Sequence, residues 1–241
     1  RYEAAIAGGI PIVKAIREGL VGNRIEWIAG IINGTSNFIL CEMIRSGSSR
    51  SFDDVLKEAQ DLGYAEADPT CDIEGIDAAH KLAILSSLAY NAHLPFERVH
   101  VEGITRITDR EIQHAQEFGY VIKLLAITKK TTRGIEARVH PTLIPEKSIL
   151  ANVSDAFNAV CVVGDAVGPT LHHGAGAGAK PTASSVVADI VDVVRTLTTD
   201  PGNRVPHLAF QPERLSQNKR SSIGNIETAY YLRLRALDKP G

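Results

Sequence analysis

The residue types that could do chemistry gather in one stretch, residues 61–81, which reads DLGYAEADPTCDIEGIDAAHK. One lysine, Lys81, ends this stretch and is followed by the apolar run LAILSSLAY. The carboxylates ahead of it are Asp61, Glu66, Asp68, Asp72, Glu74 and Asp77. A lysine is seldom buried unless it is paired, because removing its charge from water costs several kcal/mol. The pattern therefore predicts a buried lysine held by acidic neighbours.

The spacing of these groups indicates which of them can meet. Asp77 lies four residues before Lys81, so on a helix the two side chains share one face. Asp72 is nine residues before Lys81, about 900° of helical rotation, which places it on the opposite side of a regular helix. Asp72 can therefore approach the lysine only from a non-helical entry segment.

Two interpretations of this stretch remain open. In one, Asp77 and Lys81 form an ordinary ion pair at the edge of a half-exposed helix. In the other, the acids and the lysine line a pocket that binds a substrate ammonium and moves a proton. The loop of residues 63–69 favours the pocket, because Glu66 and Asp68 lie between Gly63 and Pro69, and loops held by rigid elements often carry binding groups.

The elements that must position these groups follow from hydrophobic periodicity and from the residues that begin and end helices. Thr35 or Ser36 is the predicted cap of one helix, and Ser51 with Asp54 forms an approximate capping box for the next. Helices are predicted over residues 11–20, 34–47, 51–63, 73–91, 109–119 and 186–197, a strand over 24–33, and hairpins over 120–144 and 156–174. This order predicts an α+β fold, with a mixed or antiparallel sheet and helices packed on one face.

Composition excludes several classes of protein. The formal net charge of −2 gives no reason to expect nucleic acid or an anionic membrane as a partner. No apolar run reaches the roughly 18 residues that a membrane-spanning helix needs. Three widely spaced cysteines, Cys41, Cys71 and Cys161, fit neither a disulfide framework nor a zinc site and indicate a reducing cytosol. The expected location is therefore cytoplasmic.

A glycine-rich segment before the last helix has two possible roles. Gly174, Gly176 and Gly178 lack the G-x-G-x-x-G spacing of a dinucleotide-binding unit, and the chain has no such unit elsewhere. The segment is either a tight turn from strand to helix or a backbone surface that touches a bound ligand. The histidines have no spacing typical of a metal site and are predicted to be structural or surface residues; they include His80, His93, His114, His172 and His173.

The acidic stretch also resembles the signature of a known family, homoserine dehydrogenase. The fixed positions of that signature are filled by Ala59, Gly63, Tyr64, Ala65, Asp68, Pro69, Asp72, Ile73, Gly75, Asp77 and Lys81. The segments EAAIAGGIPIVKAIREGL, GIINGTSNFIL and GAGAGAKPTASSVVADI resemble the same family in the same order, so the resemblance covers about residues 1–200.

The resemblance implies an activity and roles for particular residues. The family interconverts L-homoserine and L-aspartate 4-semialdehyde with NADP or NAD. Lys81 would be the acid/base for the substrate's proton, with Asp72 beside it. The implied substrate-binding residues are Glu66, Asp77, Tyr64 and Thr35.

The resemblance also implies contacts to a cofactor and a cation. The backbone at Gly174, Gly176 and Gly178 would lie near the nicotinamide end of the cofactor. A monovalent cation, Na⁺ or K⁺, would be bound by the backbone carbonyls of Glu3, Ile6, Gly8 and Ile10. A glycine turn that only needs a positive φ explains the same residues equally well.

The domain organisation implied by the resemblance has five parts. Residues 1–22 end a dinucleotide-binding domain, 23–173 form the catalytic and dimerisation domain, and 174–198 return to the dinucleotide-binding domain. Residues 199–228 form a linker, and 229–241 begin an ACT-like regulatory domain that could take threonine as an effector. The chain is accordingly expected to be a fragment of a homodimeric or larger enzyme, with its dinucleotide-binding half before residue 1, and to be inactive alone.

Two alternatives to this interpretation differ in class. One is a non-catalytic dimerisation or regulatory module, because the later strands are apolar enough to form a subunit interface. The other is a different amino-acid dehydrogenase with a lysine acid/base, against which the filled Asp72, Asp77 and Lys81 pattern argues.

Overall fold

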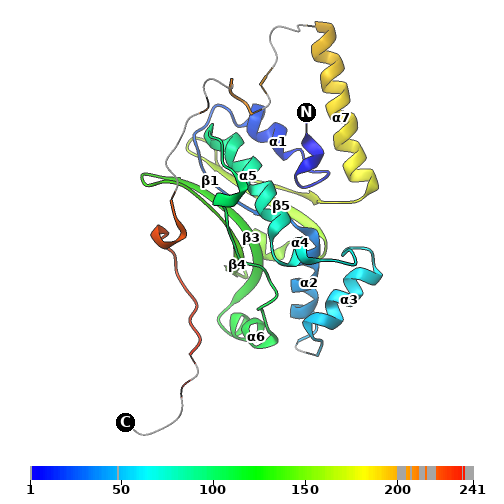
Figure 1. Cartoon of the computed structure of the whole chain (residues 1–241), viewed down its shortest axis with the longest axis vertical. Coiled ribbons are helices and arrows are strands. Elements are labelled where there is room, and N and C mark those ends of the chain that lie inside the picture. Colours follow the sequence, from blue (N-terminus) through cyan, green and yellow to red (C-terminus); the bar gives the residue numbers. More distant parts are fainter. Residues whose placement is uncertain are drawn as a thin grey trace.

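A single mixed sheet forms the centre of the structure, a computed structural model that describes residues 2–47, 49–199, 205–206, 208–211, 215, 221–234 and 236. Within these residues the strand order is β2-β4-β3-β1-β5-β6. The strands are β1 Ile25–Ile31, β2 His100–Val101, β3 Tyr120–Thr131, β4 Gly134–Pro145, β5 Phe157–Gly164 and β6 Gly168–Ala175. Only the short β2 pairs in parallel, so the predicted mixed or antiparallel sheet is confirmed (Figure 1).

Two hairpins supply four of these strands. β3 and β4 pair along their whole length, from Tyr120 opposite Pro145 to Thr131 opposite Gly134. β5 and β6 pair from Phe157 opposite Ala175 to Gly164 opposite Gly168. Both hairpins were predicted from the sequence, because alternating strands joined by a glycine-containing turn are a local signal. β1 lies between them and is antiparallel to both β3 and β5.

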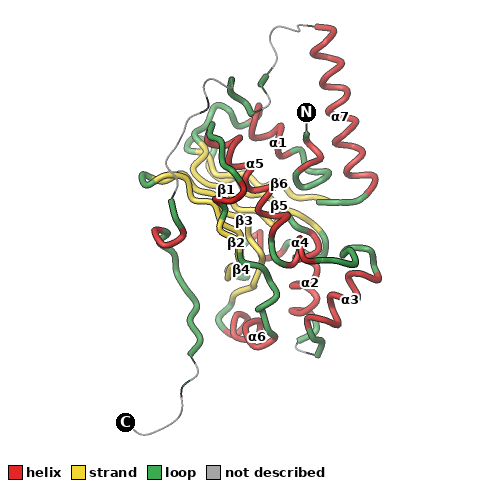
Figure 2. The backbone as a smooth tube through the Cα atoms, in the orientation of Figure 1, coloured by secondary structure: helices red, strands yellow, loops and turns green. Residues whose placement is uncertain are grey.

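Helices cover one face of the sheet, as predicted (Figures 1 and 2). They are α1 Ile12–Lys14, which continues as a π-helical turn Ala15–Gly19, α2 Gly34–Arg45, α3 Phe52–Asp61, α4 Thr70–Ile73, α5 Ile76–Tyr90 and α6 Asp109–Glu117. The main core lies between this layer and the sheet, and its buried residues include Ile28 and Val160 of the sheet and Leu82 and Leu85 of α5. Burial of α5 against β3 and β4 fixes the direction in which Lys81 points.

The other face of the sheet carries a smaller apolar cluster. The short 3₁₀ helix Ile149–Asn152 covers part of it and contributes Leu150. Its buried members are Ala29, Ile31, Leu125, Ile144, Leu150, Val153 and Ala159. Trp27, Ile127 and Cys161 are only partly buried at its margin.

Three predicted element boundaries are wrong, for local reasons. The helix predicted over 73–91 begins only at Ile76, because Gly75 before it adopts a left-handed φ of 78°, and the separate short helix α4 precedes it. The cap of α2 is Asn33, whose side chain accepts from the amide of Ser36, and not Thr35 or Ser36. The last helix, α7 Ala179–Thr199, begins seven residues before the predicted start at 186. The capping box of Ser51 and Asp54 at α3 is confirmed.

The helix α7 packs against the first residues of the chain and stands apart from the sheet (Figure 1). The amide of Glu3 donates to Asp189 at 2.8 Å, and Lys14 pairs with Asp192 at 3.1 Å. Much of the rest of α7 is apolar and exposed, at Val186, Val187, Ile190, Val191, Val193, Val194 and Leu197. Residues 2–19 and α7 therefore form one small unit beside the sheet.

The chain after residue 220 lies along the sheet edge and α6. The amide of Ser221 donates to the carbonyl of Ile135, Tyr231 contacts His114 at 2.8 Å and Arg233 pairs with Glu111 at 2.8 Å. The strand predicted in YYLRLRALDKPG is not formed in residues 230–234, because no second strand lies alongside them. Arg235 and residues 237–241 lie outside the described part of the chain, as does part of the predicted linker.

None of the helices in the described ranges combines the length and the hydropathy that crossing a bilayer requires.

Candidate active site

Lys81 is the cation of a short polar chain that joins α5 to the end of β1. Its Nζ lies 2.6 Å from Oδ2 of Asp77 and donates to the carbonyl of Ile32 at 3.2 Å. The predicted i,i+4 pair is therefore formed. Among the described residues these two contacts use two of the three N–H groups of the ammonium, which leaves one for a bound molecule.

Asn33 connects this pair to the second carboxylate. Its Nδ2 donates to Asp72 at 2.6 Å and to Asp77 at 2.9 Å. Its Oδ1 accepts from the amide of Ser36 at 2.9 Å and so caps α2. One amide side chain thus begins a helix and holds two acids in place.

Sequence reasoning missed Asn33, although a signal was available. Asparagine is among the best helix-capping residues, and Asn33 stands directly before Gly34, where α2 begins. The predicted cap, Thr35 or Ser36, lies two or three residues after the true one, so Asn33 was not among the candidate site residues.

Asp72 reaches this group from a short helix, not from a loop. It lies in α4, and its carbonyl accepts from Oγ of Ser36 at 2.8 Å. The left-handed Gly75 then reverses the chain so that α5 starts in a new direction. Among the described residues Asp72 makes no direct contact with Lys81, and the link runs through Asn33 and Asp77.

The prediction that Lys81 is buried is wrong. Its side chain is 21% exposed and that of Asp77 is 29% exposed. The apolar residues around Lys81 fill the core, while the Lys81 side chain itself stays partly exposed. An accessible lysine suits a group that exchanges protons with a bound substrate.

The pKa of the Cys71 thiol reflects the charged groups around it. Burial raises the pKa of Cys71 above its usual value, and the negative charges of Asp77 and Asp72 raise it further. The two carboxylates outnumber the one lysine in this group, an arrangement that suits a cationic ligand such as an ammonium.

Of the four predicted substrate-binding residues, Asp77 belongs to this group, and among the described contacts Thr35, Tyr64 and Glu66 do not join it. Oγ1 of Thr35 donates to the carbonyl of Tyr64 at 2.6 Å, and the rings of Tyr64 and Phe38 are 4.9 Å apart. Tyr64 and Glu66 are exposed on the loop after α3. In the described residues the carboxylate of Glu66 contacts neither Lys81 nor Asp77.

The glycine segment is a tight, closely packed turn between β6 and α7. The amide of Gly9 donates to the carbonyl of Ala175 at 3.0 Å, and Oγ of Ser185 donates to that of Gly8 at 2.7 Å. A Cβ added at Gly176 would lie 2.1 Å from the side-chain amide of Asn158. Asn158 is 1% exposed, and its Oδ1 has no hydrogen-bond partner among the described residues.

The substitution Gly176→Ala is expected to destabilise the protein through this contact. Overpacking of a close-packed interior costs about 1–3 kcal/mol, so the melting temperature should fall by about 2–10 °C. Thermal unfolding followed by circular dichroism measures the change. Adding Asn158→Ala should recover most of the loss by removing the clash, whereas an equal loss in the double variant would contradict this explanation.

The turn predicted to bind a monovalent cation has positive φ at Ala7 and Gly8, 52° and 46°, as a simple glycine turn also requires. The carbonyl of Gly8 accepts from Ser185 and that of Ile10 from the amide of Ile12, and each oxygen has a second lone pair. The side chain of Glu3 caps α1 through the amides of Val13 and Lys14. Burial raises the pKa of Glu3 above its usual value.

The histidines form no metal site within the described residues, where no three His, Cys, Asp or Glu side chains gather in a suitable cluster. His80 stacks on Phe96, with ring centroids 4.0 Å apart. His114 contacts Tyr231, and His173 stacks on Phe157.

Fold and site together define a class: an α+β domain in which an asparagine at the end of β1 joins a lysine–carboxylate pair to a second carboxylate. A family model described as homoserine dehydrogenase matches residues 11–191. The chain belongs to the homoserine dehydrogenase family.

Relatives and solved structures agree with this assignment. A homoserine dehydrogenase from Pseudomonas aeruginosa is 61% identical over 240 residues, covering 100% of this chain and 55% of the relative, and one from Bacillus subtilis is 44% identical, covering 100% and 54%. The crystal structure of a homoserine dehydrogenase from Thiobacillus denitrificans has a TM-score of 0.90 and 63% identity, covering 94% of this chain and 52% of that one. The chain thus spans about half the length of the curated relatives it matches.

Proposed function

We propose that this chain is the catalytic part of an NAD(P)-dependent enzyme that interconverts L-homoserine and L-aspartate 4-semialdehyde. The observation that carries the proposal is the chain of contacts from Lys81 through Asp77 and Asn33 to Asp72. Membership of the homoserine dehydrogenase family supports the substrate and the reaction.

In the proposed reaction Lys81 handles the proton of the substrate oxygen. As an amine it takes the hydroxyl proton while C4 of homoserine is oxidised, and as an ammonium it returns the proton in the reverse direction. The contacts to Asp77 and to the carbonyl of Ile32 hold Nζ in one position, so that its remaining site faces the substrate. Asp72 and Asn33 keep Asp77 oriented.

When NADP or NAD is bound, it supplies the acceptor or donor of the hydride. The residues that would hold its nicotinamide end are Gly174 at the end of β6 and Gly176 and Gly178 in the turn before α7. They pack near Asn158, whose side-chain oxygen has no hydrogen-bond partner among the described residues. A hyperthermophilic archaeal homoserine dehydrogenase mutant that was solved in complex with NADPH aligns with a TM-score of 0.68 and 30% identity.

The substrate's α-ammonium would be bound by carboxylates, because charge-assisted hydrogen bonds are the strongest available to it. Glu66 and Asp77 are the proposed partners, with Thr35 and Tyr64 beside them. The exposed position of Glu66 requires its loop to close over the substrate.

The activity is tested on the full-length protein that contains this chain. The purified protein, given L-homoserine and NADP⁺ or NAD⁺, is expected to produce the reduced cofactor, with L-serine and L-threonine as controls for chain length and branching. Absence of turnover with homoserine and with both cofactors would reject the proposal.

The substitution Glu66→Gln is expected to raise KM for homoserine about tenfold while kcat changes less. A hydrogen bond to a charged group contributes about 1.5–3 kcal/mol, and a contact made equally in ground and transition states appears in KM. Steady-state kinetics measure both constants, and Glu146→Gln, on an exposed turn elsewhere, is the matched control. An unchanged KM with a collapsed kcat would move Glu66 from substrate binding to chemistry.

The remaining proposals concern assembly and regulation. Residues 1–22 and 174–198 would pack on a dinucleotide-binding domain, which the exposed apolar side chains of α7 support. The open sheet face in 23–173 would form a homodimer interface. Residues 199–228 would link to an ACT-like domain beginning at 229 that takes threonine as an effector.

The turn at Glu3, Ile6, Gly8 and Ile10 would hold Na⁺ or K⁺, and the enzyme would act in the cytoplasm.

A further inference from the structure

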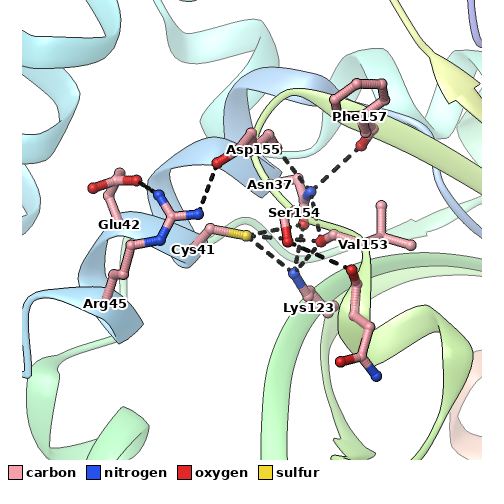
Figure 3. A network of polar contacts seen from close by, with 10 residues as sticks. Asn37, Cys41, Glu42, Arg45, Lys123, Val153, Ser154, Asp155 and Phe157 are labelled. Atoms are coloured by element: carbon pink, nitrogen blue, oxygen red, sulfur yellow. Dashed lines mark hydrogen bonds and ion pairs between the residues drawn. The ribbon is translucent and has the colours of Figure 1, made fainter.

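A second lysine, Lys123, lies inside the protein, away from the candidate active site. It belongs to β3 and is 2% exposed. Its Nζ donates to the carbonyl of Val153 at 2.7 Å, to Oδ1 of Asn37 at 3.0 Å and to Sγ of Cys41 at 3.1 Å (Figure 3). All three N–H groups of an ammonium are used in these contacts.

The partners of Lys123 are unusual for a buried cation, because none of those described is a carboxylate. Lys81, by contrast, is partly exposed and pairs with Asp77. Burial of a charge without a counter-charge is unfavourable.

The sulfur and the nitrogen are held in place from both sides. Nδ2 of Asn37 donates to the carbonyls of Val153 and Asp155, at 3.2 and 2.9 Å. The carboxylate of Asp155 pairs with Arg45 at 2.8 Å (Figure 3). Arg45 lies on α2, one helical turn after Cys41. The contact between Cys41 and Lys123 is thus part of a fixed network that joins α2, β3 and the segment before β5.

The hydrogen bonds also orient the amine. When Lys123 is neutral, its two N–H groups can stay on Asn37 and Val153, and its lone pair then points at Sγ of Cys41. The Cys41 side chain is partly exposed, so a small oxidant can reach the sulfur. Neither Cys71 nor Cys161 has a lysine within hydrogen-bond distance among the described residues.

We propose that Cys41 and Lys123 form a site of oxidative modification, in which hydrogen peroxide oxidises Cys41 and Lys123 captures the product in a covalent S–N bond. The cross-link would join α2 to β3.

The chemistry balances in two steps. The sulfur of Cys41 attacks one oxygen of hydrogen peroxide, an S–O bond forms and the O–O bond breaks. The other oxygen leaves as water with the thiol proton, sulfur is oxidised by two electrons and the peroxide is reduced. Lys123, after giving its third proton to solvent, then attacks the sulfenic sulfur. The S–N bond forms, the S–O bond breaks, and the oxygen leaves as a second water with one amine proton.

Peptide mass spectrometry of the full-length protein, treated with hydrogen peroxide and digested with trypsin, tests this proposal. The expected product joins the Cys41 peptide to the Lys123 peptide, with a mass lower than their sum by two hydrogen atoms. Trypsin should no longer cleave after Lys123, and treatment with dithiothreitol should restore both peptides.

Variants separate this site from general oxidation. The cross-link should be lost in Cys41→Ser, which nearly keeps the size of the side chain, and in Lys123→Met, which keeps its length. It should persist in Cys71→Ser and Cys161→Ser. Recovery of Cys41 as sulfinic or sulfonic acid with a free Lys123 peptide, or an unmodified Cys41 beside an oxidised Cys71, would overturn the proposal. The wild-type digest decides the matter even if Lys123→Met does not fold.

Discussion

Lys81→Ala in the full-length protein is expected to lower kcat by about 10²–10⁴-fold, the usual contribution of general acid–base catalysis. The reason is that Nζ of Lys81 is the proposed proton carrier, fixed by Asp77 and the carbonyl of Ile32. Cofactor affinity should change little, because neither contact involves the glycine turn before α7. Steady-state kinetics and a cofactor titration measure the two quantities separately.

Two further variants sharpen the Lys81 experiment. Lys81→Arg keeps the positive charge beside Asp77, yet a guanidinium does not release its proton near neutral pH, so it should be nearly as slow as the alanine variant. Lys147→Ala, on an exposed turn, should be as active as the wild type. Retention of more than about half of kcat in Lys81→Ala would remove the lysine from the acid–base role.

Asn33→Asp is expected to lower kcat/KM by about 10–10²-fold with little loss of stability. Aspartate caps helices as well as asparagine does, so α2 should still begin at Gly34. The donor that holds Asp72 and Asp77 is replaced, however, by a third carboxylate within about 3 Å of both. A hydrogen bond to a charged group contributes about 1.5–3 kcal/mol, and 1.4 kcal/mol corresponds to about tenfold in rate.

The control for Asn33→Asp must keep the cap and remove only the donor. Asn33→Ser does so, because serine caps well but its side chain is too short to bridge the two acids. Its rate should lie between those of the wild type and the aspartate variant, with a similar melting temperature. Wild-type kinetics in both variants would show that the contacts of Asn33 serve only the helix.

The parts of the fold that could be predicted from the sequence are those with local causes. Both hairpins follow from alternating side chains around short turns, and the capping box of α3 from Ser51 and Asp54. The pairing of Asp77 with Lys81 follows from helical spacing alone. In each case the interacting residues are neighbours in the chain.

The parts that could not be predicted depend on distant segments. Asn33 and Asp72 are 39 residues apart in the chain and meet only because α2 and α4 pack together. The close packing of Gly75 on the sheet, where an added Cβ would lie 3.2 Å from Val139 and 3.3 Å from Val101, also joins segments far apart in the chain. The exposure of Lys81 was misjudged because its neighbours are apolar, and a helix wheel does not show how far a long side chain extends beyond them.

The strand order has a consequence for folding while the protein is being synthesised on the ribosome. β1 is made first but lies between two hairpins that are made later, and its partners, Ala126–Lys129 and Ala159–Gly164, follow it by about 100 to 135 residues. Each hairpin can close soon after it is synthesised, within microseconds. The apolar β1 can pair with β3 only after residue 129 has left the exit tunnel, and its other edge stays unpaired until residue 164 follows. Nascent chains that end before residue 129 therefore expose β1 on both edges and should be the ones that chaperones bind.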